Sequence, residues 1–439
     1  MSQIKQLNYY KPIQEIFTLF HEEEDIALLE SSLKNKLGRF SIIGRKPYLK
    51  LVKDHVFTWN GKECEIPYEE YLKDYFTKNY KENNTDLPII SGAIGYFSYD
   101  YHRKKQNQVP ESILIFYDEF IIENHQTNSI YLVVNGKTAK EEDALKELEE
   151  KIISGIETKN CCKKEIQKPE INFNFYKEEY LQAIEKMMNY IVEGDIYIAN
   201  MTQQLFIKSD KTPYELYQIL SKKNPAPFAA YLNYGNFQVV SLSPERFIEV
   251  KGKKIRTRPI KGTRKRGATL EEDQQLKQEL ENSEKDKSEL LMIVDLERND
   301  LNKISEPGSV VVNELFTIES YATVHHLVAE VCGNLKDNIT IIDIIDAVFP
   351  GGSITGAPKL RAMEIIEELE KNQRGLYTGS IGYFSLNGDC DMSIVIRTAV
   401  FQDGVYTLGV GGGITYESHT ESEYEETLQK ARAFLDALS

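Results

Sequence analysis

The sequence has few cysteines, a single tryptophan and no long apolar run. Its 439 residues include 5 cysteines, and no two of these form a Cys-x-x-Cys pair. The odd count and the spacing argue against a disulfide framework and against a zinc site built from cysteine pairs. No stretch approaches the roughly 20 apolar residues of a membrane-spanning helix, and the first residues lack the apolar segment of a secretory signal. We therefore expect a cytoplasmic protein with no membrane partner.

Positive charge is also in short supply. Lys and Arg together number 53, against 68 Asp and Glu, which gives a formal net charge of −15. A chain with no overall basic field is not expected to have nucleic acid as its main partner. A local cluster of basic residues in such an acidic protein instead indicates a small anionic ligand.

The apolar pattern predicts a mixed α and β chain with two regions. Residues 1–155 form an amino-terminal region, residues 156–172 lose periodicity and are expected to be a linker, and residues 173–439 follow. The length allows two or three domains, or one large interwoven unit. Helices are expected at residues 139–155, 176–193, 270–302 and 360–371.

The last hundred residues predict three strands in succession. Strands are expected at residues 378–386, 392–401 and 405–411, and Asn-Gly and Asp-Gly turns separate them. This pattern is typical of an antiparallel meander. It argues against a Rossmann or barrel plan, in which a helix should separate successive strands.

Residues 257–267, TRPIKGTRKRG, form the most basic segment of the chain. Within it, Lys261 lies between a proline that fixes φ and Gly262, which lets a ligand approach the backbone. Like charge and partial burial both disfavour an ammonium group, and a free amine is a nucleophile. The alternative is one lysine in a solvated basic loop. The crowding charges are Arg258, Arg264, Lys265 and Arg266.

Two pairs of carboxylates stand in helical register. Asp286 and Glu289 are three residues apart, as are Glu423 and Glu426, so each pair projects from one face of its expected helix. Two such faces that meet would form an oxygen-rich site suited to Mg²⁺. The alternative is a pair of solvated acidic faces.

Arg397 lies in an expected strand among small and apolar residues. In an extended strand, Arg397 shares one face with Ser393, Val395 and Ala399, because these residues are spaced two apart. A half-buried guanidinium needs an anion, and a carboxylate binds it best in a bidentate manner. The alternative is a structural ion pair with one of the many acids of this chain.

Two glycine-rich segments are candidates for anion binding. The expected turn at residues 411–413 presents backbone amides that can hold a carboxylate, although it is equally a plain tight turn. Residues 350–359, PGGSITGAPK, place Ser353 and several amides at a helix amino terminus. Glu245 and His326 remain ambiguous on their own, because a lone histidine among apolar residues is often a core residue.

Together these segments resemble the chorismate-utilising enzymes, which include anthranilate synthase component I, aminodeoxychorismate synthase component I, and the isochorismate and salicylate synthases. The resemblance runs from about residue 176 to 437, and more weakly over residues 28–48. It implies an α+β fold with large antiparallel β-sheets stacked as a sandwich, helices packed outside, and the site in a cleft. The motifs are GDIYIANMTQ, SPERF, PIKGT, SEKDKSELLMIVDLERND, FPGGSITGAPKLRAMEIIEELE, IRT, GGGITYES and ESEYEET.

Lys261 resembles the aminodeoxychorismate synthase branch, because the other branches generally carry Ala in the P-I-x-G-T motif. The resemblance implies that this lysine adds to C2 of chorismate as the C4 hydroxyl leaves, and that ammonia then attacks C4. The isochorismate and salicylate enzymes have a lysine that activates water at the position of Ile198. Attack of water at C2 therefore lacks its base here.

The resemblance also implies a role for each remaining site residue. Glu289 and Glu426 are the expected Mg²⁺ ligands, with Glu423 and Asp286 acting through water. Glu245 is the expected general acid. The residues expected around the substrate are His326 and Thr263 near the ring and hydroxyl, Arg397, Tyr377, Gly411 and Gly413 at the enolpyruvyl carboxylate, Lys430 near the C1 carboxylate, and Ser353 in the pocket wall.

The expected partners are chorismate and a separate glutaminase subunit that supplies ammonia, since no cysteine lies in a glycine-flanked nucleophile elbow. The product, 4-amino-4-deoxychorismate, would lead to para-aminobenzoate and folate. By resemblance, an amino-terminal pocket near Glu30, Ser31 and Ser41 binds tryptophan, either for regulation or as a structural part. The alternatives are an anthranilate synthase component I and a non-catalytic subunit that binds chorismate or tryptophan.

Overall fold

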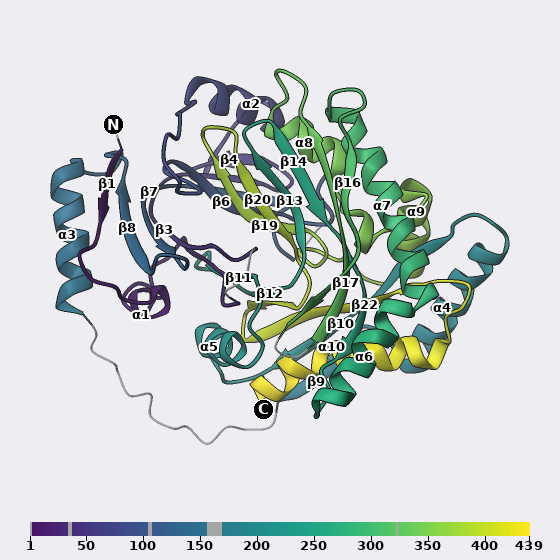
Figure 1. The fold of residues 1–439 in the computed structure, drawn as a ribbon. Helices are drawn as coiled ribbons and strands as arrows, with labels where there is room; N and C mark the ends of the chain where they lie inside the picture. The colour runs from purple at the N-terminus through teal and green to yellow at the C-terminus, as the bar shows by residue number, and fades with distance from the viewer. Residues whose placement is uncertain (1, 34–36, 104–107, 156–168, 322–323) are drawn as a thin grey trace.

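The computed structural model describes residues 2–33, 37–103, 108–155, 169–321 and 324–439. Its strands pair antiparallel and join into one continuous network with two arms that share the long strand β3 (Phe40–Lys53). Helices cover the outside, with α3 (Glu141–Ser154) at one edge and α10 (Thr420–Leu438) along the bottom of Figure 1. No helix in these ranges is long and apolar enough to cross a membrane.

The first arm contains strands from both halves of the sequence. From β3 the order is β7 (Ser112–Asn124), β6 (Gly92–Phe97), β19 (Ser380–Ser385), β20 (Cys390–Ile394), β13 (Arg246–Lys251), β14 (Lys254–Arg258) and β17 (Val324–Asn334). Strand β17 also pairs with β15 (Ile260–Lys265) and β16 (Val311–Ser320). Four short strands complete the network: β8 (Ser129–Val134) pairs with β7 and with β1 (Gln3–Gln6), and β4 (Phe57–Trp59) pairs with β3 and with β5 (Lys62–Glu63).

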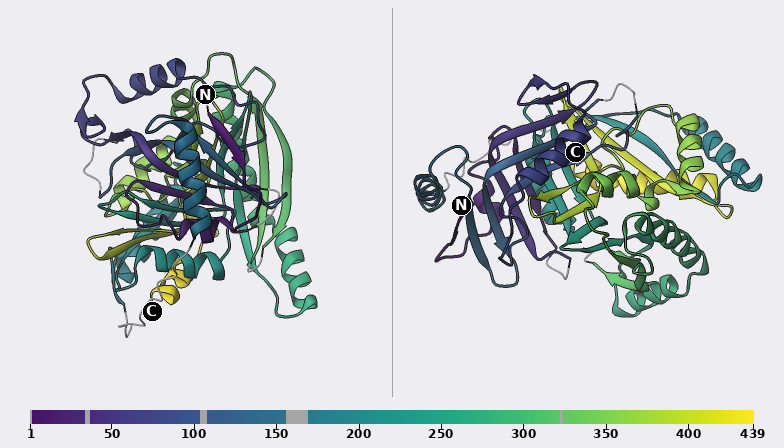
Figure 2. Two further views of the ribbon diagram at one scale, coloured as in Figure 1. Left: turned by 90° about the vertical axis from the view of Figure 1, so that its left-hand side faces the viewer. Right: turned by 90° about the horizontal axis from the view of Figure 1, so that it is seen from above.

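The second arm leaves the opposite edge of β3. Its order is β2 (Ile26–Glu30), β11 (Phe228–Asn233), β12 (Gln238–Ser243), β21 (Thr398–Gln402), β22 (Val405–Ile414) and β10 (Ile198–Lys208). Strand β10 also pairs with β9 (Glu170–Phe173) and β18 (Gly356–Ala357). Figure 2 shows the amino-terminal strands on one side of the molecule and the green helices on the other.

The core lies in layers between and outside the two arms. One buried cluster joins Ile94 and Tyr96 of β6 to Leu232 of β11 and Val239 of β12, and so fills the space between the arms. Further clusters bury the apolar faces of the outer helices against the sheets. The predicted sandwich with helices outside is therefore confirmed.

The remaining helices have the following bounds: α1 (Ile13–Phe17), α2 (Tyr68–Lys78), α4 (Lys177–Val192), α5 (Pro213–Lys223), α6 (Leu270–Asn282), α7 (Glu284–Ile304), α8 (Ile341–Val348) and α9 (Lys359–Leu369). The expected helix at 270–302 is divided at Ser283, whose side chain caps α7 by accepting a hydrogen bond from the backbone N–H of Asp286. A 3₁₀ turn, η1 (Gly352–Ile354), precedes α9.

Strand pairing crosses the boundary that the sequence suggested between two regions. Strand β2 pairs with β11, and β6 pairs with β19, so residues 1–155 and 173–439 share one sheet network. The end of the expected linker, residues 170–172, lies in strand β9 rather than in a loop. Residues 156–168 of the expected linker lie outside the described residues.

Three local predictions were wrong. The expected strand at 392–401 is two strands, β20 and β21, because the chain leaves the first arm and joins the second at residues 395–397. The glycines at 411–413 do not form a turn but continue β22, paired with β10. The basic segment is not a loop, since it forms the end of β14 and all of β15.

Candidate functional site

The expected catalytic, substrate-binding and metal-binding residues all line one cavity of about 740 Å³. Strands β15, β17 and β22, the turn η1 and helices α7 and α10 each contribute to its wall. These residues are Glu245, Lys261, Thr263, Asp286, Glu289, His326, Ser353, Tyr377, Arg397, Gly411, Gly413, Glu423, Glu426 and Lys430.

Lys261 projects from β15 toward β22. A Cβ added to Gly413 would lie 3.1 Å from its Nζ, so the absence of a side chain at Gly413 leaves room for the amine. Among the described residues, the Lys261 amine has no hydrogen bond and no ion pair. Its positive charge nevertheless acts on carboxylates of this cavity, where it opposes the rise in the pKa of Glu245 and of Glu289.

The basic neighbours of Lys261 are held by carboxylates, so they do not crowd it with uncompensated charge. Arg258 bonds to Glu314 at 2.6 Å and to Glu319 at 2.6 Å. The remaining pairs are Arg264 with Glu279 and Asp286, Lys265 with Glu272, and Arg266 with Asp273. The sequence argument from like charge therefore fails, and these residues fasten the strand.

Glu245 is a buried carboxyl group with a proton available near neutral pH. Burial raises its pKa to about 7, although a hydrogen bond with Ser353 and the charge of Lys261 both oppose this rise. The backbone N–H of Ile260 donates to its Oε1 at 3.4 Å. Such a group can serve as a general acid because its pKa lies near the working pH.

His326 and Thr263 face each other across β17 and β15. The distance from Thr263 Oγ1 to His326 Nδ1 is 2.9 Å. Burial, aided by the charge of Arg397, lowers the pKa of His326 to about 3, so the imidazole is neutral at physiological pH. Its buried Nε2 has no hydrogen-bond partner in the described part of the chain, and is open to a polar ligand atom.

Arg397 occupies the crossing between β20 and β21, with φ at 50°. The sequence prediction that it lies on a strand face was wrong, but the expected burial is present: burial lowers the pKa of its guanidinium. No carboxylate of the described ranges forms an ion pair with it, which removes the structural alternative. A buried guanidinium without an acid partner is a strong anion site.

Both carboxylate pairs, Asp286 with Glu289 and Glu423 with Glu426, line this cavity. A Cβ on Gly412 would lie 3.1 Å from Glu423 Oε2 and 3.6 Å from Glu426 Oε1, so these two groups approach the same point. Burial raises the pKa of Glu289 and of Glu423. Lys430 holds the pKa of Glu426 low against the effect of burial, and lies 2.6 Å from it.

The donor set has the hard oxygen chemistry that Mg²⁺ requires, but the carboxylates have internal partners. Asp286 bonds to Arg264 at 3.1 Å, and Glu423 accepts from Ser418 at 2.7 Å. Over the residues that the structure describes, no three acidic, histidine or cysteine side chains form a group that could hold a metal ion. A cation at this place must therefore exchange some of these contacts.

Two charged residues of α7 were missed by the sequence analysis. Lys285 lies one turn before Glu289, at 4.0 Å, and faces the same cavity. Glu297 is buried, accepts a hydrogen bond from Thr257 at 2.9 Å, and has its pKa raised to about 8 by burial. The sequence signal for Glu297 was its helical spacing from the buried Ile293 and Val294.

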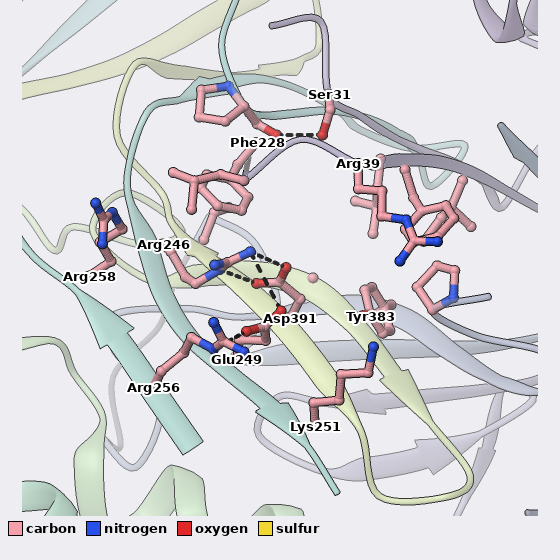
Figure 3. A pocket seen from close by; sticks show the side chains of 18 of the residues that line it. Ser31, Arg39, Phe228, Arg246, Glu249, Lys251, Arg256, Arg258, Tyr383 and Asp391 are labelled. Carbon is pink, nitrogen blue, oxygen red and sulfur yellow. Dashed lines mark hydrogen bonds and ion pairs between the residues drawn. The ribbon is translucent and has the colours of Figure 1, made fainter. Parts of the chain in front are cut away.

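A second cavity, of about 800 Å³, lies near the amino-terminal strands and is shown in Figure 3. Glu30 and Ser31 line it, as expected for the amino-terminal pocket. Ser41 lies behind, where its hydroxyl accepts from Ser31 N at 3.0 Å and contacts His125 Nε2 at 2.8 Å. The carboxylate of Glu30 is already bonded to Tyr217 and Gln14.

The charged groups in the wall of this second cavity are mostly paired with one another. Arg246 binds Asp391 in a bidentate manner, at 2.9 and 2.8 Å, and Arg256 lies 2.5 Å from Glu249 (Figure 3). Arg246 directly follows Glu245, so neighbouring residues reach the two different cavities.

The sequence matches the family model for chorismate binding enzymes over residues 33–436. It is 40% identical to aminodeoxychorismate synthase component 1 of Bacillus subtilis, over 97% of this chain and 94% of that protein. It is 35% identical to anthranilate synthase component 1 of Acetivibrio thermocellus, over 96% of this chain and 92% of the relative.

Solved structures agree with this assignment. Anthranilate synthase component I from Streptococcus pneumoniae superposes with a TM-score of 0.82 at 28% identity, covering 97% of each chain. The menaquinone-specific isochorismate synthase of Escherichia coli shares the fold, with a TM-score of 0.76 at 17% identity over 100% of this chain and 95% of its own. With the family model matched over most of its length, the chain belongs to the family of chorismate binding enzymes.

Proposed function

We propose that this chain is the synthase component of an aminodeoxychorismate synthase, which converts chorismate and ammonia into 4-amino-4-deoxychorismate and water. One observation carries the proposal: the Lys261 amine, which has no hydrogen bond or ion pair among the described residues, enters the cavity that also contains the buried acid Glu245. The 40% identity to a relative of that name supports it.

In the first step, the Lys261 nitrogen uses its electron pair to form a bond to C2 of chorismate. The ring double bonds shift, the C4–O bond breaks, and the hydroxyl leaves as water after it takes the proton of Glu245. In the second step, ammonia bonds to C4, the double bonds shift back, and the C2–N bond breaks. The added nitrogen gives up a proton to Glu245, which restores both residues.

The substrate is a dianion, and the cations of the cavity fit its two carboxylates. Arg397 binds the enolpyruvyl carboxylate beside Tyr377, and Lys430 lies near the other carboxylate. The neutral His326 hydrogen-bonds an oxygen substituent of the ring through its Nε2, which has no partner among the described residues.

We also propose that Glu289 and Glu426 hold Mg²⁺, with Glu423 and Asp286 acting through water. Burial raises the pKa of Glu289 and of Glu423, and the charge of Lys430 keeps the pKa of Glu426 low. A bound cation would stabilise the ionised form of all three carboxylates. The metal, when bound, would supply a Lewis acid for the ring carboxylate. Isothermal titration with MgCl₂ checks this, and Glu289→Gln together with Glu426→Gln should abolish the heat of binding.

The test of the reaction is to incubate the purified chain with chorismate, MgCl₂ and an ammonium salt, and to identify the product by mass spectrometry. We expect the mass of 4-amino-4-deoxychorismate. Fluorescent anthranilate formed without any lyase would instead establish the anthranilate synthase alternative. Relatives of that name at 35% and 36% identity are the reason to test for it. Binding of chorismate with no turnover would favour the non-catalytic alternative.

Two partners follow from this proposal. A glutaminase subunit supplies ammonia, in agreement with relatives that are named as component 1. Tryptophan occupies the second cavity, because Phe228 and Tyr383 offer aromatic faces and Arg39 has a buried Nε without a hydrogen-bond partner among the described residues.

A further inference from the structure

Ile198 packs beside the amine of Lys261. A Cβ added to Gly413 would lie 3.1 Å from Lys261 Nζ and 3.3 Å from Ile198 Cδ1, so both atoms flank the same small space. No side chain stands between them, because the residue at that point is glycine. The isoleucine is therefore the apolar neighbour of the proposed nucleophile.

The backbone holds Ile198 in this position. It begins β10, where it pairs with Ala357 of β18, and the next residue, Ala199, pairs with Ile414 of β22. Since side chains alternate along a strand, Tyr197 points outward and is 66% exposed, whereas Ile198 is 2% exposed. A β-branched side chain in a strand has little freedom at χ1, so it cannot swing away from the amine.

An isoleucine at this place gives the amine no side-chain hydrogen-bond acceptor. Lys261 has no hydrogen bond and no ion pair in the described ranges, although carboxylates line the same cavity. An acceptor beside an ammonium group favours the charged form, which is not nucleophilic. An apolar wall offers no such acceptor and also limits where the amine can point.

We propose that Ile198 is a positioning residue, which keeps the Lys261 amine unpartnered on the β10 side and directs it into the cavity. The catalytic consequence of this inference rests on the proposed function, in which Lys261 is the nucleophile. Its physical content, the reactivity of one amine, can be measured without any substrate.

The test is competitive acetylation of the full chain with a trace of acetic anhydride, followed by mass spectrometry of the Lys261 peptide. The exposed Lys186 on α4 serves as the internal reference. The matched variants are Ile198→Thr and Ile198→Val, which have the same shape and differ only in a hydroxyl group that can accept a hydrogen bond. We expect the relative labelling of Lys261 to fall about tenfold in Ile198→Thr compared with Ile198→Val, as one hydrogen bond to a charged group predicts.

A second polar variant, Ile198→Gln, keeps the test decisive if the threonine variant does not fold, and thermal melts identify such a failure. Equal labelling of Lys261 in the folded polar and apolar variants overturns the inference. In turnover with ammonium, the polar variant should lower kcat and leave KM for chorismate unchanged. If the wild-type chain does not aminate C4 but the labelling still differs, the proposed function fails and the role of Ile198 stands.

Discussion

The two cavities of this protein are similar in volume and rich in charge, but they differ in how that charge is satisfied. In the second cavity the buried Arg246 is bound by Asp391 through two hydrogen bonds. In the proposed catalytic cavity the half-buried Arg397 has no acid partner among the described residues, and Lys261 has none either. Pairing within the protein offsets the desolvation cost of a buried charge, so removing one partner destabilises the fold, whereas a charge left unpaired can be compensated by a ligand of opposite charge.

The largest effect should come from the amine that defines the catalytic cavity. Lys261→Ala should lower kcat for amination at C4 by about 10³-fold or more, because the covalent route is lost. Chorismate binding, measured by isothermal titration calorimetry, should persist, since Arg397 and Lys430 remain. Lys261→Arg is the control that retains the charge without a nucleophilic amine, and it should be equally inactive. Unchanged C4 amination in either variant contradicts the covalent role.

Substitutions of Arg246 and Arg397 test whether the paired arginine supports the fold and the unpaired one binds substrate. Arg397→Gln should raise KM for chorismate by about 10²-fold, because a desolvated charge pair with the substrate is lost. Since no internal partner is left behind, its melting temperature should not fall. Arg246→Leu should instead lower the free energy of unfolding by about 3–5 kcal/mol, because it leaves Asp391 buried without its counter-charge. Urea denaturation and steady-state kinetics measure both effects.

The opposite outcome would be equally informative. If Arg397→Gln destabilises the chain as much as Arg246→Leu does, then Arg397 is part of the framework and not an anion site. If Arg246→Leu raises KM for chorismate while the chain stays folded, the two cavities are coupled through the adjacent residues Glu245 and Arg246.

The acid Glu245 gives the catalytic cavity a pH dependence that the second cavity does not impose. Its pKa of about 7 exceeds that of an ordinary glutamate because of burial, and only the protonated form can donate to the leaving hydroxyl. As the pH rises through about 7 the acid form is lost, so the ratio of wild-type kcat to the kcat of Glu245→Gln should fall about tenfold per pH unit above it. Total ammonium must be adjusted at each pH so that free ammonia stays constant.

Glu245→Gln should be less active by about 10²- to 10⁴-fold, and its residual kcat should show no decline with pH on this limb. A decline that persists in the variant would assign the titration to another group. Glu297, whose pKa burial raises to about 8, is the first to examine, and Glu297→Gln is the matched control.

The residues that the sequence assigned to one site do line one cavity, whereas the strands that build this cavity were predicted less well. Motif resemblance brought Lys261, Glu245 and Arg397 to one site, since each residue type suits a distinct chemical task. Local pattern failed where tertiary pairing decides conformation. The sheet crossing at 395–397 reads as continuous strand, because apolar alternation there does not reveal which arm will pair with each half.

Ion pairing was the other feature that the sequence could not reveal. Residues 257–267 resemble a solvated loop in sequence, because the partners of Arg258 lie on β16, 56 and 61 residues along the chain. Long-range pairs of this kind depend on the register of strands, which composition does not encode. The near coincidence of Ile198, Gly413 and Lys261 has the same origin, because three separate strands meet there.

The smallest expected effect belongs to the second cavity, where most charged side chains are already paired within the protein before a ligand binds. Free tryptophan at about ten times its Kd should raise the free energy of unfolding by about 1.4 kcal/mol, as linkage requires for a ligand that binds only the folded state. Arg39→Gln should remove this effect, because it takes away the guanidinium that faces the cavity without a full set of partners. The same variant should leave stabilisation by chorismate unchanged. Loss of both effects would show that the two cavities act as one site, and tryptophan stabilisation that survives in Arg39→Gln would place the amino acid elsewhere.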